Sequence, residues 1–174
     1  MKLLFYLLLL LFAAVARADE RPRLLVLTDI GGDPDDQQSL IRLMVYANEF
    51  DIEGLIASAS GTPAELKTAV VRPALIREIV TAYGKVRTNL AHHKDGWPTV
   101  DDLLLCIKSG NPKRGLAHVG AEHDTEGSRW IMERVNAGTP RRPLNISIWG
   151  GQTDLAQALW RVRHDHGAAG LARF

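Results

Sequence analysis

Two kinds of hydrophobic pattern alternate along the chain, and each predicts a different element. Short continuous apolar runs, bounded by turn-forming residues, occur at 23–29, 51–60 and 143–149. Runs of this kind are typical of strands that a sheet buries on both faces. Apolar residues at helical spacing follow each of these strands. They predict helices at 35–49, 64–82, 99–108, 124–136 and 153–162, with a break in the second near Pro73.

Strands that alternate with helices favour an α/β fold with an open, mostly parallel sheet and flanking helices. Only three strands are readable in the sequence. The helix predicted at 153–162 is one that such a fold normally follows with a further strand. We therefore expect the N-terminal portion of a longer domain, incomplete at its C-terminal side.

The first residues have the order of a secretory signal peptide. Lys2 precedes an apolar run at 3–15, and the small-x-small triplet Ala16-Arg17-Ala18 follows it. This run is shorter than the roughly 20 residues that a bilayer span needs. We predict a cleaved signal peptide at 1–18, a domain at 19–174, secretion or export to a periplasm, and no stable membrane insertion after cleavage.

Composition and charge narrow the classes of partner. The chain is 46% hydrophobic and 24% charged, which is ordinary for a globular fold. Cleavage would remove Lys2 and Arg17 but no acid, and would change the net charge from +1 to −1. Such a balance gives no electrostatic case for nucleic acid. Cys106 is the single cysteine and lies in an apolar run, so we predict a small core residue.

The segment 28–40, TDIGGDPDDQQSL, crowds four aspartates into eight positions: Asp29, Asp33, Asp35 and Asp36. Helix capping explains part of this crowding. Asp33 suits the N-cap, Pro34 suits the first helical position, and the next two aspartates face the positive end of the helix dipole. Capping does not explain Asp29, which ends the first predicted strand.

A bound hard cation would account for the remaining charge. Neighbouring carboxylates repel one another, and calcium prefers clusters of carboxylate and carbonyl oxygens. The segment has no cysteine or histidine, which speaks against zinc. It also lacks the closing glutamate of an EF-hand and the Gly-Lys-Ser/Thr of a phosphate-binding loop. The sequence therefore predicts a calcium site.

A second motif, WGGQTDLAQAL at 149–159, follows the last predicted strand. It can be explained as a strand-turn-helix connection, in which Gly150-Gly151 make the turn and Thr153 or Asp154 caps the helix. It shares its position with the aspartate segment, because both follow the carboxyl end of a strand. Open α/β sheets bind their ligands at that edge.

Together, LTDIGGDPDD and GGQTDLAQAL resemble the nucleoside hydrolase superfamily. The resemblance is closer to the secreted nucleoside hydrolase-like domain of cellulose-binding proteins, and it covers 22–174. It rests on TDIGGDPDDQQSLIRLMVYANEFDIEGLIA, DTEGSRWI and GGQTDLAQALW. In nucleoside hydrolases, an aspartate after the first strand, a later Asp-Asp pair and a backbone carbonyl hold calcium.

The resemblance implies roles for individual residues. Asp29 would bind calcium and orient the attacking water, and Asp36 would be the second carboxylate ligand. Trp149 would contribute only its main-chain carbonyl. Asp35 would bind a sugar hydroxyl, although the longer IGGDP spacing here could give that role to Asp33.

Other residues match the family less completely. Glu126 or Asp124 in HDTEGS would line the substrate pocket, or would simply cap a helix. The asparagine expected after the second strand is replaced by Ser60-Gly61. Nothing after Thr153 matches the late aspartate and histidine of the superfamily, and the group at 164–166 lies at the far end of a helix.

These features lead to two functional expectations. The first is an exported, calcium-dependent N-glycoside hydrolase-like protein in which water attacks the anomeric carbon and Asp29 accepts its proton. The alternative is a secreted, non-catalytic carbohydrate- or cellulose-binding protein that retains the fold. The expected ligand is a small nucleoside or carbohydrate. Either expectation is compatible with a homo-oligomer. Either is also compatible with a chain that, as an N-terminal portion of its domain, has no activity by itself.

Overall fold

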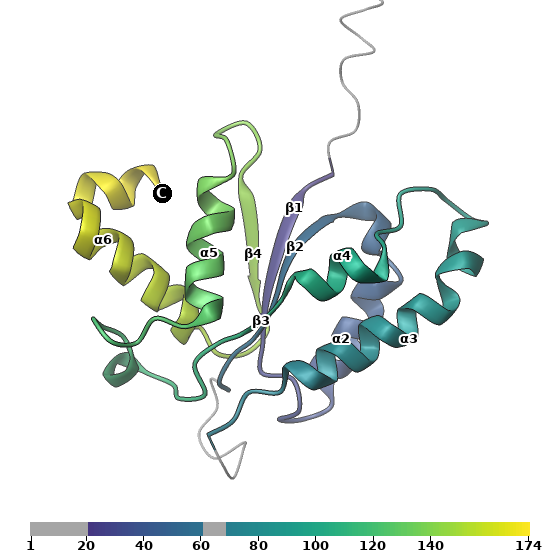
Figure 1. The fold of residues 1–174 in the computed structure, drawn as a ribbon, viewed down its shortest axis with the longest axis horizontal. Coiled ribbons are helices and arrows are strands. Elements are labelled where there is room, and N and C mark those ends of the chain that lie inside the picture. The colour runs from purple at the N-terminus through teal and green to yellow at the C-terminus, as the bar shows by residue number, and fades with distance from the viewer. Residues whose placement is uncertain (1–20, 61–68) are drawn as a thin grey trace, which may run out of the picture.

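A computed structural model describes residues 21–60 and 69–174, so the predicted signal peptide at 1–18 lies outside the described residues. Four parallel strands form an open sheet with the order β3-β2-β1-β4 (Figure 1). The strands are β1 Arg23–Thr28, β2 Asp51–Ala57, β3 Ile107–Ser109 and β4 Leu144–Ile148. The predicted α/β class with an open parallel sheet is confirmed.

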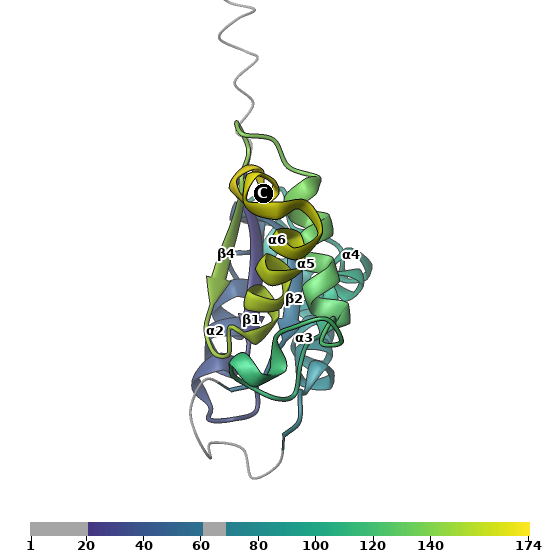
Figure 2. The same ribbon diagram turned by 90° about the vertical axis from the view of Figure 1, so that its left-hand side faces the viewer.

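Helices cover both faces of this sheet (Figures 1 and 2). One layer consists of α2 Asp35–Met44, α3 Pro73–Ala91 and α4 Val100–Leu105, and the other of α5 Glu126–Asn136 and α6 Thr153–Arg173. The described residues also form two short 3-10 helices, η1 Ala47–Glu49 and η2 Leu116–His118. Within the described ranges, no helix is both long and apolar enough to span a bilayer.

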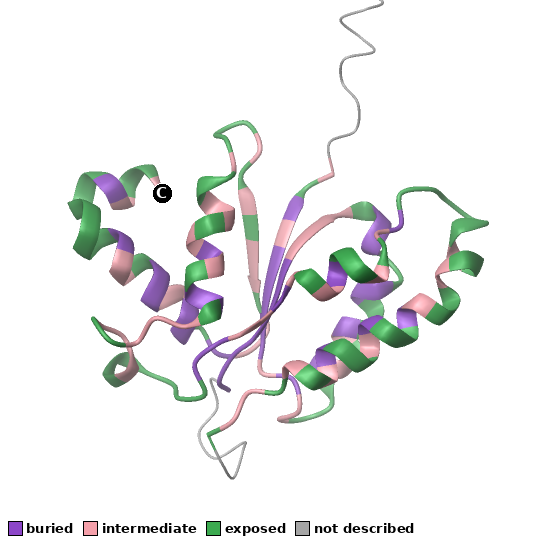
Figure 3. Cartoon of the chain, viewed as in Figure 1, coloured by how far each residue is buried: buried purple, intermediate pink, exposed green. Residues whose placement is uncertain are grey.

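Strand β1 shows why a continuous apolar run is required. Val26 packs with α2, α3 and α4, whereas Leu25 and Leu27 pack with Ile131 of α5 and Ala158 of α6. All of these side chains are fully buried. In Figure 3, most of the length of β1 has the colour of buried residues. Burial of each large aliphatic side chain stabilises the fold by roughly 1.5–3 kcal/mol, so both faces of β1 must be apolar.

Two predicted helices have different bounds in the structure. The helix predicted at 99–108 ends at Leu105, and its last residues form β3, which pairs with β2. An apolar run of that length fits a helix or a strand equally well. In the described part of the region predicted as a helix at 64–82, residues 69–72 are not helical and α3 runs from Pro73 to Ala91. This agrees with the break predicted near Pro73, because proline suits the first helical turn and disfavours helix in the residue before it. Residues 61–68 are not described.

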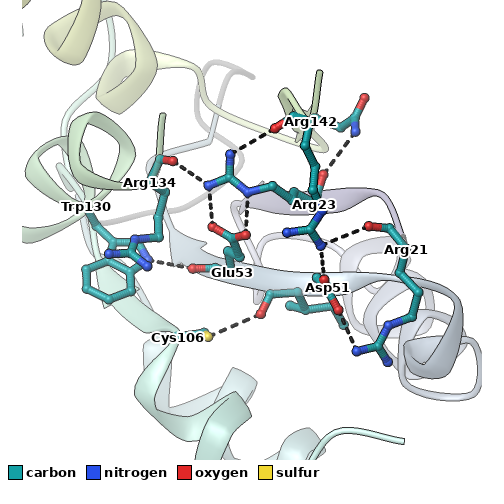
Figure 4. A network of polar contacts seen from close by, with 10 residues as sticks. Arg21, Arg23, Asp51, Glu53, Cys106, Trp130, Arg134 and Arg142 are labelled. Atoms are coloured by element: carbon teal, nitrogen blue, oxygen red, sulfur yellow. Dashed lines mark hydrogen bonds and ion pairs between the residues drawn. The ribbon is translucent and has the colours of Figure 1, made fainter. Parts of the chain in front are cut away.

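A polar network joins the amino-terminal ends of the strands (Figure 4). The Arg23 guanidinium, only 3% exposed, donates to both carboxylate oxygens of Glu53 at 2.5 and 2.7 Å. Asp51 pairs with Arg21 and Arg142.

Cys106 donates to the Ile52 carbonyl, and burial raises the pKa of its thiol to about 11, which keeps it protonated and unreactive. Cys106 was predicted to be a core residue, and in the structure it is half-buried.

Candidate functional site

The carboxyl ends of β1 and β4 meet at the residues that the two motifs singled out. Asp29 directly follows β1, and its carboxylate lies against Gly150. A Cβ atom added at Gly150 would come within 2.1 Å of Asp29 Cγ, and one added at Gly151 would come within 1.5 Å of the Ala59 carbonyl oxygen. The glycine pair is therefore required because the turn after β4 passes so close to the ends of β1 and β2.

Asp36 is the buried member of the aspartate cluster, with 4% of its surface exposed. Thr28 Oγ1 donates to Asp36 Oδ2 at 2.5 Å and accepts from the Ile30 N–H at 3.1 Å. Burial, together with the nearby carboxylates of Asp29 and Asp35, raises the pKa of Asp36 to about 6, and the Thr28 hydrogen bond opposes this rise. The structure therefore brings Asp29 and Asp36 together, as the motif predicts.

Asp33 and Asp35 are exposed at the start of α2. The helix begins at Asp35, the first residue of the predicted range 35–49, but its N-cap is Pro34 rather than the predicted Asp33, and no side chain caps it. Asp33 Oδ1 accepts from the Asp35 N–H at 3.3 Å, and Asp35 Oδ1 accepts from the Asp36 N–H at 2.8 Å. The contact with Asp35 raises the pKa of Asp33. Either exposed carboxylate is free of the sheet and open to a ligand hydroxyl.

Trp149 continues the ladder beyond β4. Its N–H donates to the Leu27 carbonyl at 2.9 Å, and its indole Nε1 donates to Ser147 Oγ at 3.0 Å. Because Gly150 follows at once, the main chain leaving Trp149 passes against the Asp29 carboxylate. This position is compatible with the predicted use of the Trp149 backbone carbonyl.

Glu126 is placed away from this cluster. It begins α5 beside β3, where its Oε2 accepts from the Ser109 N–H at 3.1 Å and its Oε1 lies 3.4 Å from Lys108 Nζ. Strand β2 lies between β3 and β1, so Glu126 is about 10 Å from Asp29 across the sheet. The helix cap is supplied by Thr125, in a capping box with Ser128.

Asp154 is a residue whose role the sequence did not indicate. Instead of capping α6, as one prediction held, it is completely buried and bridges three segments. Its carboxylate accepts from Ser58 Oγ at 2.6 Å, Thr125 Oγ1 at 2.6 Å and the Asn111 N–H at 3.0 Å. It therefore ties the ends of β2 and β3 and the start of α5 to α6. Helix α6 has no side-chain cap at Gln152.

The histidines of α6 are remote from the cluster. His164 follows Thr153 by about 16 Å along the helix, at roughly 1.5 Å per residue. It is exposed, and its ring stacks on Trp160 with centroids 4.8 Å apart. This placement agrees with the prediction that 164–166 lie away from the site.

The cluster offers only oxygen donors. Two carboxylates, those of Asp29 and Asp36, stand close enough for Asp29 to raise the pKa of Asp36, and the Thr28 hydroxyl and the main chain at Trp149 lie beside them. Within residues 21–60 and 69–174, no three histidine, cysteine, aspartate or glutamate side chains form a metal-binding group. An oxygen-only set suits calcium rather than zinc, and water or ligand hydroxyls would have to complete its shell.

An open parallel sheet with carboxylates at its carboxyl edge is the arrangement of an α/β domain that binds its ligand at that edge. A family model, the nucleoside hydrolase-like domain of the cellulose-binding protein Sde182, matches residues 23–174, and the chain belongs to this family. It is similar to the solved structure of a nucleoside hydrolase-related hypothetical protein from Saccharophagus degradans that is associated with carbohydrate metabolism. The two are 36% identical, with a TM-score of 0.80 over 87% of this chain and 36% of that one. No curated protein matches.

Proposed function

We propose that this domain contributes a calcium-dependent site for hydrolysis of N-glycosidic bonds, in an exported protein. The observation that carries the proposal is that Asp29, at the carboxyl end of β1, lies close enough to the buried Asp36 to raise the pKa of that residue. Two carboxylates held this close in a half-buried site repel each other, and a divalent cation relieves that repulsion. The related structure is longer than the region that this chain covers, so further parts of the site would come from outside that region.

Asp29, Asp36 and the Trp149 main-chain carbonyl would hold the ion, which would lower the pKa of a water in its shell. Asp29 would orient that water and accept its proton during attack on the anomeric carbon. Positive charge develops on the sugar as the C–N bond breaks, and the carboxylates of this cluster stabilise it electrostatically. Asp35, or Asp33 beside it, would accept a hydrogen bond from a sugar hydroxyl.

Calorimetric titration with calcium and an assay of base release from a nucleoside test this function. Wild type is expected to bind calcium, and Asp36→Asn to bind it at least about tenfold more weakly because the second anionic ligand is lost. Asp101→Asn, which changes an exposed acid on α4, is the matched control. Equal calcium affinity in wild type and Asp36→Asn would refute the site.

A second candidate function is carbohydrate binding without catalysis. The family description names cellulose binding, and the related structure is associated with carbohydrate metabolism. The described residues also place only two carboxylates at the buried centre of the cluster. Retention on insoluble cellulose, with no release of base or sugar, would support this function over hydrolysis.

A further inference from the structure

A cavity of about 660 Å³ opens beside the aspartate cluster, between α2 and the end of β4. Helix α2 and β4 lie on the same side of the molecule in Figure 2. Asp35 lies at one end of the cavity, and Trp149 forms the wall opposite α2. This volume is in the range of sites that hold small organic ligands.

Polar side chains of α2 form one wall of this cavity. Asp35, Gln38 and Arg42 line it at the spacing of one helix face, while Leu40 and Met44 point into the core. These side chains offer both donors and acceptors in a row. A ligand with hydroxyl groups along its edge could pair with several of them at once.

Three aromatic side chains also line the cavity. Trp149, Tyr46 and Phe50 all face the cavity, and 56% of the Tyr46 surface is exposed. The hydrogen bond from Trp149 Nε1 to Ser147 Oγ fixes the indole against the strand. A ring held in this way loses little freedom when a flat apolar surface packs on it.

The charges around the cavity nearly cancel. Asp35 and Arg42 carry opposite charges, and Glu49 pairs with Lys94 at 2.7 Å, a contact that lowers the pKa of Glu49. A phosphate or another anion would gain little in such surroundings. A neutral ligand with flat apolar faces and polar edges matches both walls, and a β-linked pyranose chain has that form because its C–H groups line the ring faces and its hydroxyls line the edges.

We infer that the cavity between α2 and Trp149 is a binding groove for a β-linked glucan chain, with Trp149 and Tyr46 as stacking platforms and the polar face of α2 as hydroxyl partner. This inference rests on the carbohydrate-binding function proposed above and gives it a site. The groove begins at Asp35, so a bound chain would end beside the aspartate cluster.

Calorimetry with cellohexaose, and depletion from solution by swollen cellulose, test the groove in the purified protein. Trp149→Ala and Tyr46→Ala are each expected to weaken binding by at least about tenfold, since stacked aromatic side chains dominate such contacts. Trp149→Phe keeps a ring and should recover most of the affinity. Trp160→Ala removes a tryptophan that stacks on His164 outside the groove, and is expected to bind as wild type does.

The outcomes separate the groove from the function on which it rests. If wild type binds neither cellohexaose nor cellulose, the carbohydrate-binding function and the groove both fail. If wild type binds and folded Trp149→Ala and Tyr46→Ala, checked by circular dichroism, bind equally well, the groove is refuted and the function stands. Equal binding of maltohexaose, whose α-linkages coil the chain, would overturn the β-linked class of ligand.

Discussion

The Asp29 carboxylate lies so close to Gly150 that a single added methyl group would come within 2.1 Å of Asp29 Cγ. The two residues come from different motifs and from adjacent strands, β1 and β4. Their contact fixes the turn after β4 over the end of β1. The aspartate cluster and the glycine turn are therefore parts of one site.

Gly150→Ala should destabilise the protein by about 1–3 kcal/mol, because the new methyl group must displace the carboxylate or the turn. Asp29→Ala removes the atoms that the methyl group meets. Urea unfolding of the two single variants and the double variant should therefore give a double-mutant cycle in which the losses are not additive. Strictly additive losses would mean that the two residues are not in contact.

Asp154→Ala should destabilise the fold by about 3–5 kcal/mol, because it leaves the Ser58 and Thr125 hydroxyls and the Asn111 N–H buried without their acceptor. Asp154→Asn keeps one acceptor oxygen and should cost less. Asp165→Ala, on the exposed part of the same helix, is the control and should leave the stability almost unchanged. Chemical unfolding measures all three, and a loss at Asp154 as small as at Asp165 would contradict the bridging role.

The raised pKa of Asp36 predicts how stability depends on pH without metal. The folded protein holds a proton on Asp36 up to a pH of about 6, whereas the unfolded chain releases it near the ordinary value of 3.8. The folded state therefore binds more protons between these values, and this contribution to stability is lost as the pH rises from about 4 to about 6. Unfolding in the presence of a chelator should show a fall in wild type that Asp36→Asn lacks. An unchanged difference between the two proteins across this range would refute the shift.

Glu53→Ala should destabilise the protein by about 3 kcal/mol, because it leaves the buried Arg23 guanidinium without its carboxylate partner. Glu49→Ala breaks the exposed pair with Lys94 and should cost far less, because solvent screens that pair. Thermal and urea unfolding of both variants provide the comparison. Similar losses at the two positions would show that burial adds nothing to the Arg23–Glu53 pair.

The sequence predicts the elements whose apolar pattern is long and unambiguous. Strands β1, β2 and β4 and the starts of α2, α5 and α6 lie within a few residues of their predicted positions. Strand β3 has only three residues and is continuous with an apolar helix, so no pattern distinguishes it. Strand β4 was expected to be buried, but it is the edge of the described sheet, and Asn145 and Ile148 are exposed.

In the candidate site, too, some residues could be predicted from the sequence and others could not. The resemblance to nucleoside hydrolases paired Asp29 with Asp36, and only a short connection separates Asp29, directly after β1, from Asp36 in the first turn of α2. The role of Asp154 could not be predicted, because its three partners belong to loops that are distant in sequence and meet only in the folded chain. The motif placed Glu126 in the substrate pocket with the aspartates, but Glu126 lies beside β3 and the strand order puts β2 between β3 and β1. That order depends on β3, which the pattern did not reveal.

A single carboxylate, that of Asp154, accepts hydrogen bonds from Ser58, Asn111 and Thr125, so a fluctuation that moves Asp154 releases all three segments together. Local fluctuations at this edge of the sheet should therefore be cooperative and governed by one opening free energy. In native-state hydrogen exchange, the Asn111 amide and the first amides of α5 and α6 would exchange together. A ligand that bound any one of the three segments would then slow exchange in all of them.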